Sequence, residues 1–391
     1  MMNDTNKRDP AQLCGKQHQS LKGRRRKLKK CRLSLFVLVV ILLFPLTLRT
    51  NQEENSEKSL SAFPILMYDT DIGLGYGGKA RFVYYLGYKE SFDIIVFNST
   101  KGERWYVFTF SIPDTEIRQG KVYPLSMDIK AEYDKFLKFN YYGIGQDSQE
   151  EDLTIHTYTK EELRFVLGRG FTPYFVIEAG YALKSTRFSN VEEGKPFTQT
   201  LEALGEQFSP YASIVIRYDT SDSQIHPRRG FRIIFQSDVA GGYLGNKYAS
   251  YYRASLDFRK YLVLFGEKDV LAARFLVQQI SGDKVPLYEM PVLGGGSTMD
   301  SMRGYSMSRF RDRGKFLVNV EYRFPIWGRL GGNVFADAGC VWPKWSDIDL
   351  KKSAVDVGCG LRYYLKNFLG RFDVGFSKEG MGVYFNFGHV F

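Results

Sequence analysis

The stretch "GNVFADAGCVW", Gly332 to Trp342, alternates between two kinds of side chain along its length. Successive residues of a β-strand point to opposite faces of the sheet, so a period of two separates the two faces. The stretch therefore predicts a strand with one mixed face and one apolar face. The mixed face carries Asn333, Phe335, Asp337 and Gly339, and the apolar face carries Val334, Ala336, Ala338, Cys340 and Trp342.

The same alternation recurs on both sides of this stretch. Residues 316–327 place Glu321 opposite an apolar face, and residues 354–366 do the same with Asp356. Strands of a water-soluble sandwich also alternate, so alternation alone leaves a secreted all-β protein as an alternative. A face that repeatedly carries charge and glycine, opposite a continuously apolar and aromatic face, is typical of a barrel with lipid outside and a wet lumen inside.

Composition and strand count favour the barrel. The chain holds 26 Tyr, 31 Phe and 38 Gly residues, and its one long apolar run lies near the N-terminus, which favours many short strands over helices. The sixteen strands that we expect make an even number, as in single-chain bacterial barrels. We therefore predict an all-β, transmembrane antiparallel β-barrel of about 16 strands. The expected strands are residues 63–69, 72–86, 91–99, 102–112, 121–135, 155–169, 172–186, 206–219, 229–243, 248–265, 268–281, 316–327, 331–342, 354–366, 371–377 and 382–391.

The net charge of +11 is concentrated at the N-terminus. Residues 1–50 hold twelve of the 54 Lys and Arg residues but only two of the 43 Asp and Glu residues. The remainder of the chain is nearly neutral. A basic nucleic-acid surface is therefore not implied, and we expect no nucleic-acid partner.

That basic segment leads into an apolar run, Leu33 to Leu48, within "KGRRRKLKKCRLSLFVLVVILLFPLTL". The run is short for a helix that spans a membrane, which needs roughly 20 apolar residues, and it suits the core of an export signal. No clean small-x-small cleavage site follows, so an uncleaved anchor is the alternative. We expect residues 1–50 to be the export signal, residues 51–62 a short polar linker and residues 63–391 the transmembrane barrel.

The connections between the expected strands differ in length. If the chain enters from the periplasm, the odd-numbered connections face outside and include the long ones, whereas several connections on the periplasmic side are short, as in outer-membrane barrels. One long connection contains "LGGGSTMDSMRGYSMSRFRDRG", Leu293 to Gly314, which carries four arginines. The long connections are residues 136–154, 187–205 and 282–315, and the short ones include 87–90, 170–171, 266–267 and 328–330.

Three motifs in this order resemble the BamA/TamA/FhaC superfamily of outer-membrane barrels, also called bacterial surface antigen barrels. "MRGY", Met302 to Tyr305, is similar to the family's arginine-glycine-aromatic motif on a long loop folded into the lumen. "VFADAG", Val334 to Gly339, resembles its Phe-x-Asp-x-Gly strand motif, and "YDTSDSQIHPRRGF", Tyr218 to Phe231, its periplasmic turn. "YDTDIGLGYGGKARF", Tyr68 to Phe82, is a looser match to the first hairpin. The resemblance spans residues 63–391 and implies an extracellular loop folded into the lumen.

The resemblance also implies a contact that locks this loop. A guanidinium inside a lumen needs hydrogen-bond partners, and a carboxylate can accept two parallel bonds from it. Asp337 faces inward by strand parity, and the family places it beside the motif arginine, so we expect Arg303 to bind Asp337. Glu321, inward on the adjacent strand, is the alternative partner.

The other motif residues have supporting roles in this hypothesis. We expect Gly304 to allow a tight turn or a positive φ at the loop tip, and Tyr305 to pack against the barrel wall. Phe335 and Gly339 belong to the strand motif that receives the loop. The remaining loop arginines, Arg309, Arg311 and Arg313, are interpreted as wet charges that line the lumen or meet anionic lipid head groups.

We interpret the residues of the periplasmic turn motif as structural. Aspartate caps turns through its side chain and glycine tolerates positive φ, so Asp219, Asp222, Pro227 and Gly230 are interpreted as turn formers. Cys14 and Cys31 fall in the export segment. Cys340 and Cys359 remain, and the sequence leaves open whether they form a disulfide across neighbouring strands or stay as buried free thiols.

Two functions follow from the resemblance. Family members that fold or export proteins usually carry periplasmic POTRA domains, but Arg49 to Ala62 is too short for a domain, which needs about 40 residues. We expect a POTRA-less barrel in the bacterial outer membrane that contacts outer-membrane lipid. It would aid insertion or transport of protein or lipid clients with separate periplasmic partners. The route would be a weak seam between a first strand broken by Pro64 and the last strand, which ends at Phe391. Pro64 also has a simpler interpretation, because any barrel must begin somewhere and a proline at the start of its first strand costs little. The alternative is a passive or gated pore, or a structural surface barrel.

No sequence signal favours an enzyme. The chain has neither a Gly-x-Ser-x-Gly motif nor a His/Cys cluster with metal spacing, so we expect no catalytic residue, metal or cofactor. Its four histidines are scattered: His18 lies in the export segment, and His156 and His226 lie near the ends of strands or turns. His389 shares strand parity with Phe387 and Phe391, which we expect to face lipid.

Overall fold

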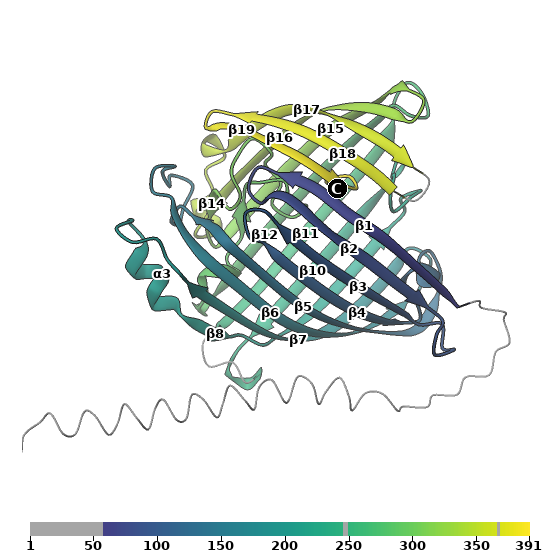
Figure 1. Cartoon of the computed structure of the whole chain (residues 1–391), viewed down its shortest axis with the longest axis horizontal. Helices are drawn as coiled ribbons and strands as arrows, with labels where there is room; N and C mark the ends of the chain where they lie inside the picture. The colour runs from purple at the N-terminus through teal and green to yellow at the C-terminus, as the bar shows by residue number, and fades with distance from the viewer. Residues whose placement is uncertain (1–57, 245–248, 366–367) are drawn as a thin grey trace, which may run out of the picture. The chain divides into compact units, whose positions relative to one another are not determined.

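The computed structural model describes residues 58–244, 249–365 and 368–391, and this part of the chain forms a closed antiparallel β-barrel (Figure 1). Each strand of the wall pairs with the next, and the last pairs with the first. The predicted transmembrane barrel of about 16 strands is confirmed. The wall consists of β1 (Ser59–Asp69), β2 (Gly73–Val83), β3 (Ser91–Ser99), β4 (Arg104–Ile112), β5 (Tyr123–Tyr141), β6 (Thr154–Gly170), β7 (Phe175–Ser189), β9 (Tyr211–Asp219), β10 (Gly230–Ala240), β11 (Ser250–Val263), β12 (Val270–Lys284), β15 (Gly314–Trp327), β16 (Leu330–Trp342), β17 (Ala354–Leu365), β18 (Phe368–Ser377) and β19 (Gly380–Phe387).

Short elements occupy the connections. None of the helices in the described part of the chain is long and apolar enough to cross a membrane. The short strand β8 pairs with β7, and the helix α3 stands at the left end of the barrel in Figure 1. The connecting elements are α2 (Thr115–Arg118), α3 (Thr198–Leu204), β8 (Glu206–Phe208), η1 (Gly242–Leu244), η2 (Leu287–Glu289), β13 (Val292–Leu293), β14 (Phe310–Arg311), η3 (Trp345–Asp347) and η4 (Leu350–Lys352).

The two ends of the barrel differ as the sequence predicts. The long connections lie at one end, which we name the loop end, and most connections at the other, the turn end, are short. The loop end has residues 142–153, 190–210, 285–313 and 343–353, and the turn end includes residues 171–174, 264–269 and 328–329.

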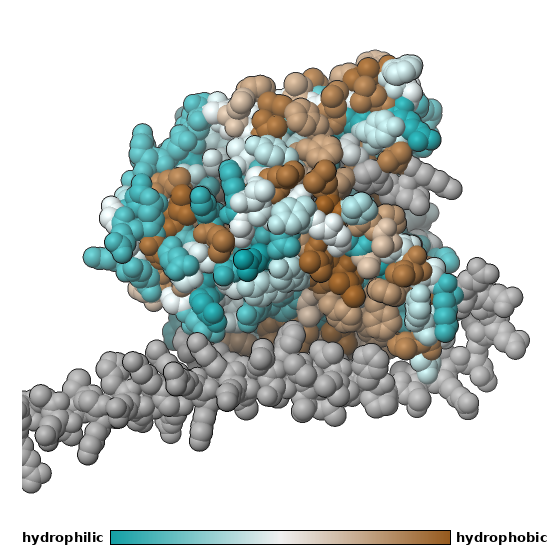
Figure 2. Space-filling view, in the orientation of Figure 1, coloured by the Kyte–Doolittle hydropathy of each residue, from teal (hydrophilic) through white to brown (hydrophobic). Residues whose placement is uncertain are grey.

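The wall carries apolar side chains outside and polar side chains inside. In β17 the outward Val355 and Val357 are 53% and 54% exposed, whereas Asp356 between them is 1% exposed. In β16 Val334 is exposed and Asp337 is buried in the same way. Apolar side chains accordingly cover much of the strand surface in Figure 2. This arrangement suits a wall that meets lipid on its outer face.

The first and the last strand of the barrel do not have the bounds that the sequence predicts. Strand β1 begins at Ser59 instead of residue 63, and it continues without a break through Pro64, which lies opposite Gly78. The prediction that Pro64 breaks this strand is wrong. The expected export signal at residues 1–50, and residues 51–57 of the expected linker, lie outside the described residues.

The last strand ends earlier than expected, at Phe387. Gly388 has φ +78°, a conformation that glycine adopts without steric cost, and here the chain leaves the wall. Val390 and Phe391 are buried against Tyr261 and Ala272. The expectation that Phe391 faces lipid is therefore wrong, because parity along a strand holds only until the strand ends.

The long connection between β12 and β15 returns into the barrel, as predicted. Its two short strands β13 and β14 pair with each other, and the residues between them form the loop tip. Loop and wall residues share a buried apolar cluster inside the lumen. It consists of Leu276, Leu293, Met302, Tyr305, Phe310, Leu317, Val341 and Ala354.

The seam between β1 and β19 is much shorter than the other side of β1. Towards β2, β1 is paired along its whole length, from Ser59 with Val83 to Asp69 with Gly73. Towards β19, it pairs only through Tyr68 with Phe385 and Asp69 with Tyr384. In the next connection, the Thr70 N–H donates to the Val383 carbonyl at 3.1 Å. The seam is thus closed only near the loop end.

Candidate functional site

Arg303 lies at the loop tip, fully buried in the lumen. Its Nε donates to Asp337 Oδ2 at 2.8 Å and its Nη2 donates to Asp337 Oδ1 at 2.9 Å. These two parallel bonds from a guanidinium to one carboxylate are among the strongest polar contacts in proteins. Strand β16 presents Asp337 inward through its alternation, so the strand pattern positions one half of the contact and the loop supplies the other.

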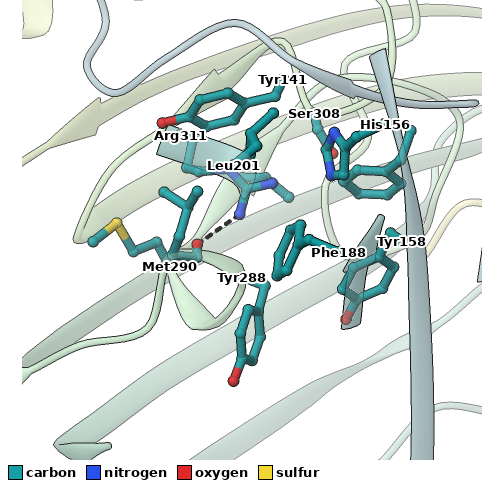
Figure 3. A pocket seen from close by; sticks show the side chains of 12 residues that line it. Tyr141, His156, Tyr158, Phe188, Leu201, Tyr288, Met290, Ser308 and Arg311 are labelled. Atoms are coloured by element: carbon teal, nitrogen blue, oxygen red, sulfur yellow. Dashed lines mark hydrogen bonds between the residues drawn. The ribbon is translucent and has the colours of Figure 1, made fainter. Parts of the chain in front are cut away.

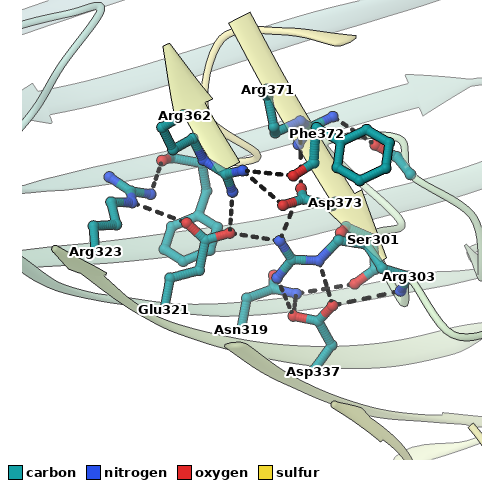
Figure 4. Close-up of polar contacts among 12 residues, drawn as sticks. Ser301, Arg303, Asn319, Glu321, Arg323, Asp337, Arg362, Arg371, Phe372 and Asp373 are labelled. Carbon is teal, nitrogen blue, oxygen red and sulfur yellow. Dashed lines mark hydrogen bonds and ion pairs between the residues drawn. The ribbon is translucent and has the colours of Figure 1, made fainter. Parts of the chain in front are cut away.

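The alternative partner, Glu321, binds Arg303 at the same time. Nη1 of Arg303 donates to Glu321 Oε1 at 2.6 Å and to Asp373 Oδ2 at 3.3 Å (Figure 4). The guanidinium carbon also lies 3.3 Å from the centre of the Phe335 ring. Burial alone would lower the pKa of Arg303, but the three carboxylates outweigh this effect and hold the pKa well above its usual value.

The charges around Arg303 continue into a network across the lumen face of β15 to β18. Glu321 Oε2 accepts from Arg323 Nε at 2.9 Å, and Asp373 Oδ1 accepts from Arg362 Nη1 at 2.7 Å. Asn319 Nδ2 donates to Asp337 Oδ1 at 2.7 Å. Sequence reasoning did not assign Asn319, Arg323, Arg362 or Asp373 to the site. Their inward parity was the signal that could have found them.

Glycines let the loop approach the wall closely. A Cβ on Gly304 would lie 2.6 Å from the Asp356 Cβ, so the absence of a side chain permits this contact. Gly304 is not among the residues with positive φ, so close packing rather than a left-handed turn explains it. A Cβ on Gly339 would lie 2.8 Å from Leu293 Cδ1. Tyr305 is buried and its hydroxyl lies 3.4 Å from the Val355 carbonyl oxygen.

Two further loop arginines are buried, contrary to the interpretation that they are solvated charges. Arg309, 3% exposed, donates from Nε to Glu379 Oε2 at 2.6 Å and from Nη1 to Ser148 Oγ at 2.9 Å. Arg311, 5% exposed, donates to the Leu287 carbonyl at 2.8 Å. The interpretation failed because Glu379 and Ser148 come from other connections at the loop end, which local sequence cannot bring together with the loop. Arg313 is half-buried.

A second anchor holds the stem of the loop. Glu289, 3% exposed, accepts from Lys184 Nζ at 2.7 Å and from Arg253 Nη1 at 2.9 Å. Arg253 also bonds Asp238 at 2.7 Å. Lys184 and Arg253 belong to β7 and β11. Sequence reasoning missed this anchor, because Glu289 lies in no motif and 105 residues separate it from Lys184.

The turn between β9 and β10 is built by the residues expected there. Asp219 Oδ1 accepts from the Ser221 N–H at 2.9 Å, and Asp222 Oδ1 accepts from the Arg228 N–H at 2.8 Å. Gly230 has φ +96°, and Pro227 is buried within the turn. These contacts give the motif a structural role at the turn end.

The two cysteines of the barrel, Cys340 and Cys359, do not form a disulfide. Cys340 is buried and Cys359 is exposed, and both are free thiols. Cys359 lies opposite Val334, so the strand register keeps the two sulfurs apart and the disulfide alternative is wrong. Within residues 58–391, apart from the two gaps, no group of His, Cys, Asp or Glu side chains could hold a metal ion.

The fold and the locked loop together define a class: transmembrane β-barrels in which a long loop returns into the lumen and is bound there through an arginine. The chain belongs to the Omp85 superfamily, because the model of the Omp85 superfamily domain matches residues 86–391. The resemblance to BamA-type barrels is confirmed. The described residues contain the barrel and no POTRA region.

Solved structures with the same fold include three bacterial barrels. BamA from Haemophilus ducreyi lacking POTRA domains 1–3 is 15% identical with a TM-score of 0.64, over 85% of this chain and 70% of that chain. CdiB from Escherichia coli is 10% identical with a TM-score of 0.57, over 85% of this chain and 67% of that chain. CdiB from Acinetobacter baumannii is 12% identical with a TM-score of 0.52, over 84% of this chain and 59% of that chain. No curated protein matches the sequence.

Proposed function

We propose that this barrel resides in the bacterial outer membrane and aids the insertion or transport of protein or lipid there. The observation that carries the proposal is the short seam between β1 and β19. Strand β1 pairs with β19 only at Tyr68 and Asp69, so its residues Ser59–Met67 have no strand partner on that side within the described part of the chain. Such an unpaired edge can accept another strand through backbone hydrogen bonds.

The position of the seam supports a lateral route. The outward side chains around it are apolar: Leu66, Tyr68 and Phe385 are 53%, 43% and 37% exposed. A client that pairs with the free edge would therefore pass from the lumen or the turn end into lipid without crossing a polar surface. Opening would break few backbone hydrogen bonds, each of net value about 0.5–1.5 kcal/mol in water.

The loop lock fits the same function. With Arg303 bound to strands β15, β16 and β18, the wall next to the seam is fixed while the seam itself is free to open. We propose that separate periplasmic proteins deliver the clients to the barrel. We propose outer-membrane lipid and client proteins or lipids as the direct contacts.

A pore is the second candidate, and one cavity favours it. A polar cavity of about 270 Å³ lies in the lumen beside the loop stem. Gln236, Arg253, Gln278 and Lys315 line it together with the loop residue Asp300. A gated pore would conduct solutes through such a space if the loop moved aside.

A reversible cross-link of the seam separates the two functions. In a background with Cys340 and Cys359 replaced by serine, Tyr68→Cys with Phe385→Cys would join β1 to β19, and Tyr68→Cys with Leu74→Cys would join β1 to β2 as the matched control. Directly opposite residues of antiparallel strands have Cα atoms about 4.5–5.5 Å apart, which suits a disulfide. Each variant would replace the native protein in its own cell.

The readout is the inventory of outer-membrane proteins and lipids under oxidising and reducing conditions. We expect the seam cross-link to deplete other barrels or outer-leaflet lipid, and reductant to restore them, while the control cross-link changes nothing. An unchanged inventory with the seam cross-linked would contradict an insertion or transport function through the seam. Solute flux that stops on deletion, with a normal inventory, would then support the pore.

A further inference from the structure

A second cavity, distinct from the lock, lies at the loop end between the loop stem and the wall. Its volume is about 100 Å³, and residues from β5, β6, β7, α3 and the loop stem line it (Figure 3). An engineered apolar cavity of about 150 Å³ binds benzene. This cavity, of about 100 Å³, is smaller, so it has room for one small ring at most. Its walls are mainly aromatic, with Phe139, Tyr141, His156, Tyr158, Phe188 and Tyr288.

The guanidinium of Arg311 borders this aromatic space with one edge free. Nη1 donates to the Leu287 carbonyl at 2.8 Å. Nε is buried and has no hydrogen-bond partner. Among the described residues, the side-chain hydrogen bond of Arg311 comes from Nη1, and none comes from Nη2. The Nε and Nη2 hydrogens form the side of a guanidinium that holds a carboxylate with two parallel bonds. Arg303 holds Asp337 through this same pair of atoms.

Arg311 also differs from the other two buried loop arginines in its charge partners. Arg303 and Arg309 each bind carboxylates, whereas no carboxylate among the described residues lies within ion-pairing distance of Arg311. Burial lowers the pKa of the Arg311 guanidinium, since a buried charge without a counter-ion is unfavourable. An anion bound in the cavity would supply the missing partner.

Ser308 adds a polar group and local strain at the same cavity. It is 5% exposed, lines the cavity, and has φ +58°, which a residue with a Cβ rarely adopts. Such strained conformations occur preferentially at active sites and ligand sites. The described residues offer no hydrogen-bond partner to the Ser308 hydroxyl, so it is available to a ligand.

We propose that this cavity is a binding site for a small carboxylate whose apolar part is a single ring. The carboxylate would accept two hydrogen bonds from Nε and Nη2 of Arg311, and the ring would pack among Tyr141, Phe188 and Tyr288. Because the cavity lies at the loop end, the ligand would enter from the side of the long connections. The binding site is independent of the seam and of any client.

Binding of benzoate to the purified barrel in detergent micelles tests this inference. Saturation-transfer NMR and calorimetry would compare benzoate with benzamide, which keeps the ring without the charge, and with acetate, which keeps the charge without the ring. We expect saturable binding of benzoate, with benzamide and acetate at least tenfold weaker. Benzamide that binds as well as benzoate would overturn the role of Arg311, and no saturable benzoate binding would overturn the site.

Two variants locate the binding. Arg311→Met removes the charged edge at similar length, and Arg313→Met is the matched control, because Arg313 lies on the same loop and does not line the cavity. Leu201→Phe fills the space from α3 and leaves Arg311 intact. We expect Arg311→Met and Leu201→Phe to weaken benzoate binding at least tenfold and Arg313→Met to leave it unchanged. If Arg311→Met fails to fold, Leu201→Phe decides: benzoate binding as tight as in the parent protein would overturn the inference.

Discussion

The loop in the lumen is held at two anchors that have opposite polarity. At the tip, the cation Arg303 comes from the loop and the wall supplies Asp337, Glu321 and Asp373. At the stem, the anion Glu289 comes from the loop and the wall supplies Lys184 and Arg253. The tip is bound to β15, β16 and β18, and the stem is bound to β7 and β11.

The opposite polarity specifies how the loop is placed. If the loop tip lay at the stem site, Arg303 would approach the cations Lys184 and Arg253. If the loop stem lay at the tip site, Glu289 would approach the carboxylates there. Like charges buried together are strongly disfavoured, so each anchor excludes the other position. The anchors also differ in redundancy: Arg303 has three carboxylate partners, whereas Lys184 has Glu289 alone among the ion pairs of the described residues.

The largest effect should come from Arg303→Ala. This change leaves three carboxylates in the lumen with their common cation removed, and loss of one partner from a buried ionic contact costs about 3–5 kcal/mol. We expect the free energy of unfolding to fall by that amount, measured by urea unfolding and by the temperature at which the barrel loses its heat-modifiable migration. Arg313→Ala, at a half-buried arginine of the same loop, should change the free energy by less than about 0.5 kcal/mol. Equal effects of the two changes would contradict the lock.

Glu289→Ala should have the next largest effect, about 2–3 kcal/mol. Lys184 would lose its partner, but Arg253 would keep Asp238 at 2.7 Å, so the loss should be smaller than at the tip. Glu289→Gln is the control, because its amide oxygen still accepts a hydrogen bond and should recover part of the loss. The same unfolding measurement applies, and a larger loss than for Arg303→Ala would reverse the comparison of the two anchors.

Asp337→Ala should cost less, about 2 kcal/mol, because Glu321 and Asp373 still bind Arg303. The double change Arg303→Ala with Asp337→Ala should be no worse than Arg303→Ala alone, since the second change removes a carboxylate that has already lost its partner. Unfolding energies of the two single variants and the double variant give the coupling. Additive losses would show that the pairing of the two side chains contributes nothing.

The smallest effect concerns the coupling between the two anchors. Arg303 and Glu289 share no partner and bind different strands, so their losses should add within about 0.5 kcal/mol in Arg303→Ala with Glu289→Ala. The double variant would be compared with both single variants by urea unfolding. A combined loss well below the sum would mean that the loop leaves the lumen as one unit once either anchor is removed.

The fold could be predicted from the sequence because the pattern that specifies it is local. Alternation places Asp337, Glu321 and Asp356 inward from their immediate neighbours alone, and the strand count then follows. The site at the loop tip could be predicted for the same reason, because the loop motif adds Arg303 to the inward carboxylates. The exact strand ends could not be predicted. Gly388 turns the chain away from the wall where the parity of Phe387 and Phe391 predicted a continuing strand.

The rest of the loop could not be predicted because its contacts join distant segments without a repeating pattern. Glu289 binds Lys184 across 105 residues, and Arg309 binds Glu379 across 70 residues. An acidic residue near a loop stem is usually solvated, so nothing in its neighbourhood distinguishes Glu289. Burial of Arg309 and Arg311 likewise depends on connections that come together only in the closed barrel.

The strands differ greatly in length around the barrel. Strand β5 has 19 residues and β6 has 17, whereas β19 at the seam has only 8. A tilted strand needs about 9–11 residues to cross the hydrocarbon core of a bilayer, so β19 is too short for a bilayer of ordinary thickness. Lipid next to a short hydrophobic surface thins to match it, at a cost of a fraction of a kcal/mol per Å. The membrane beside β19 should therefore be thinner and less ordered than the membrane beside β5 and β6.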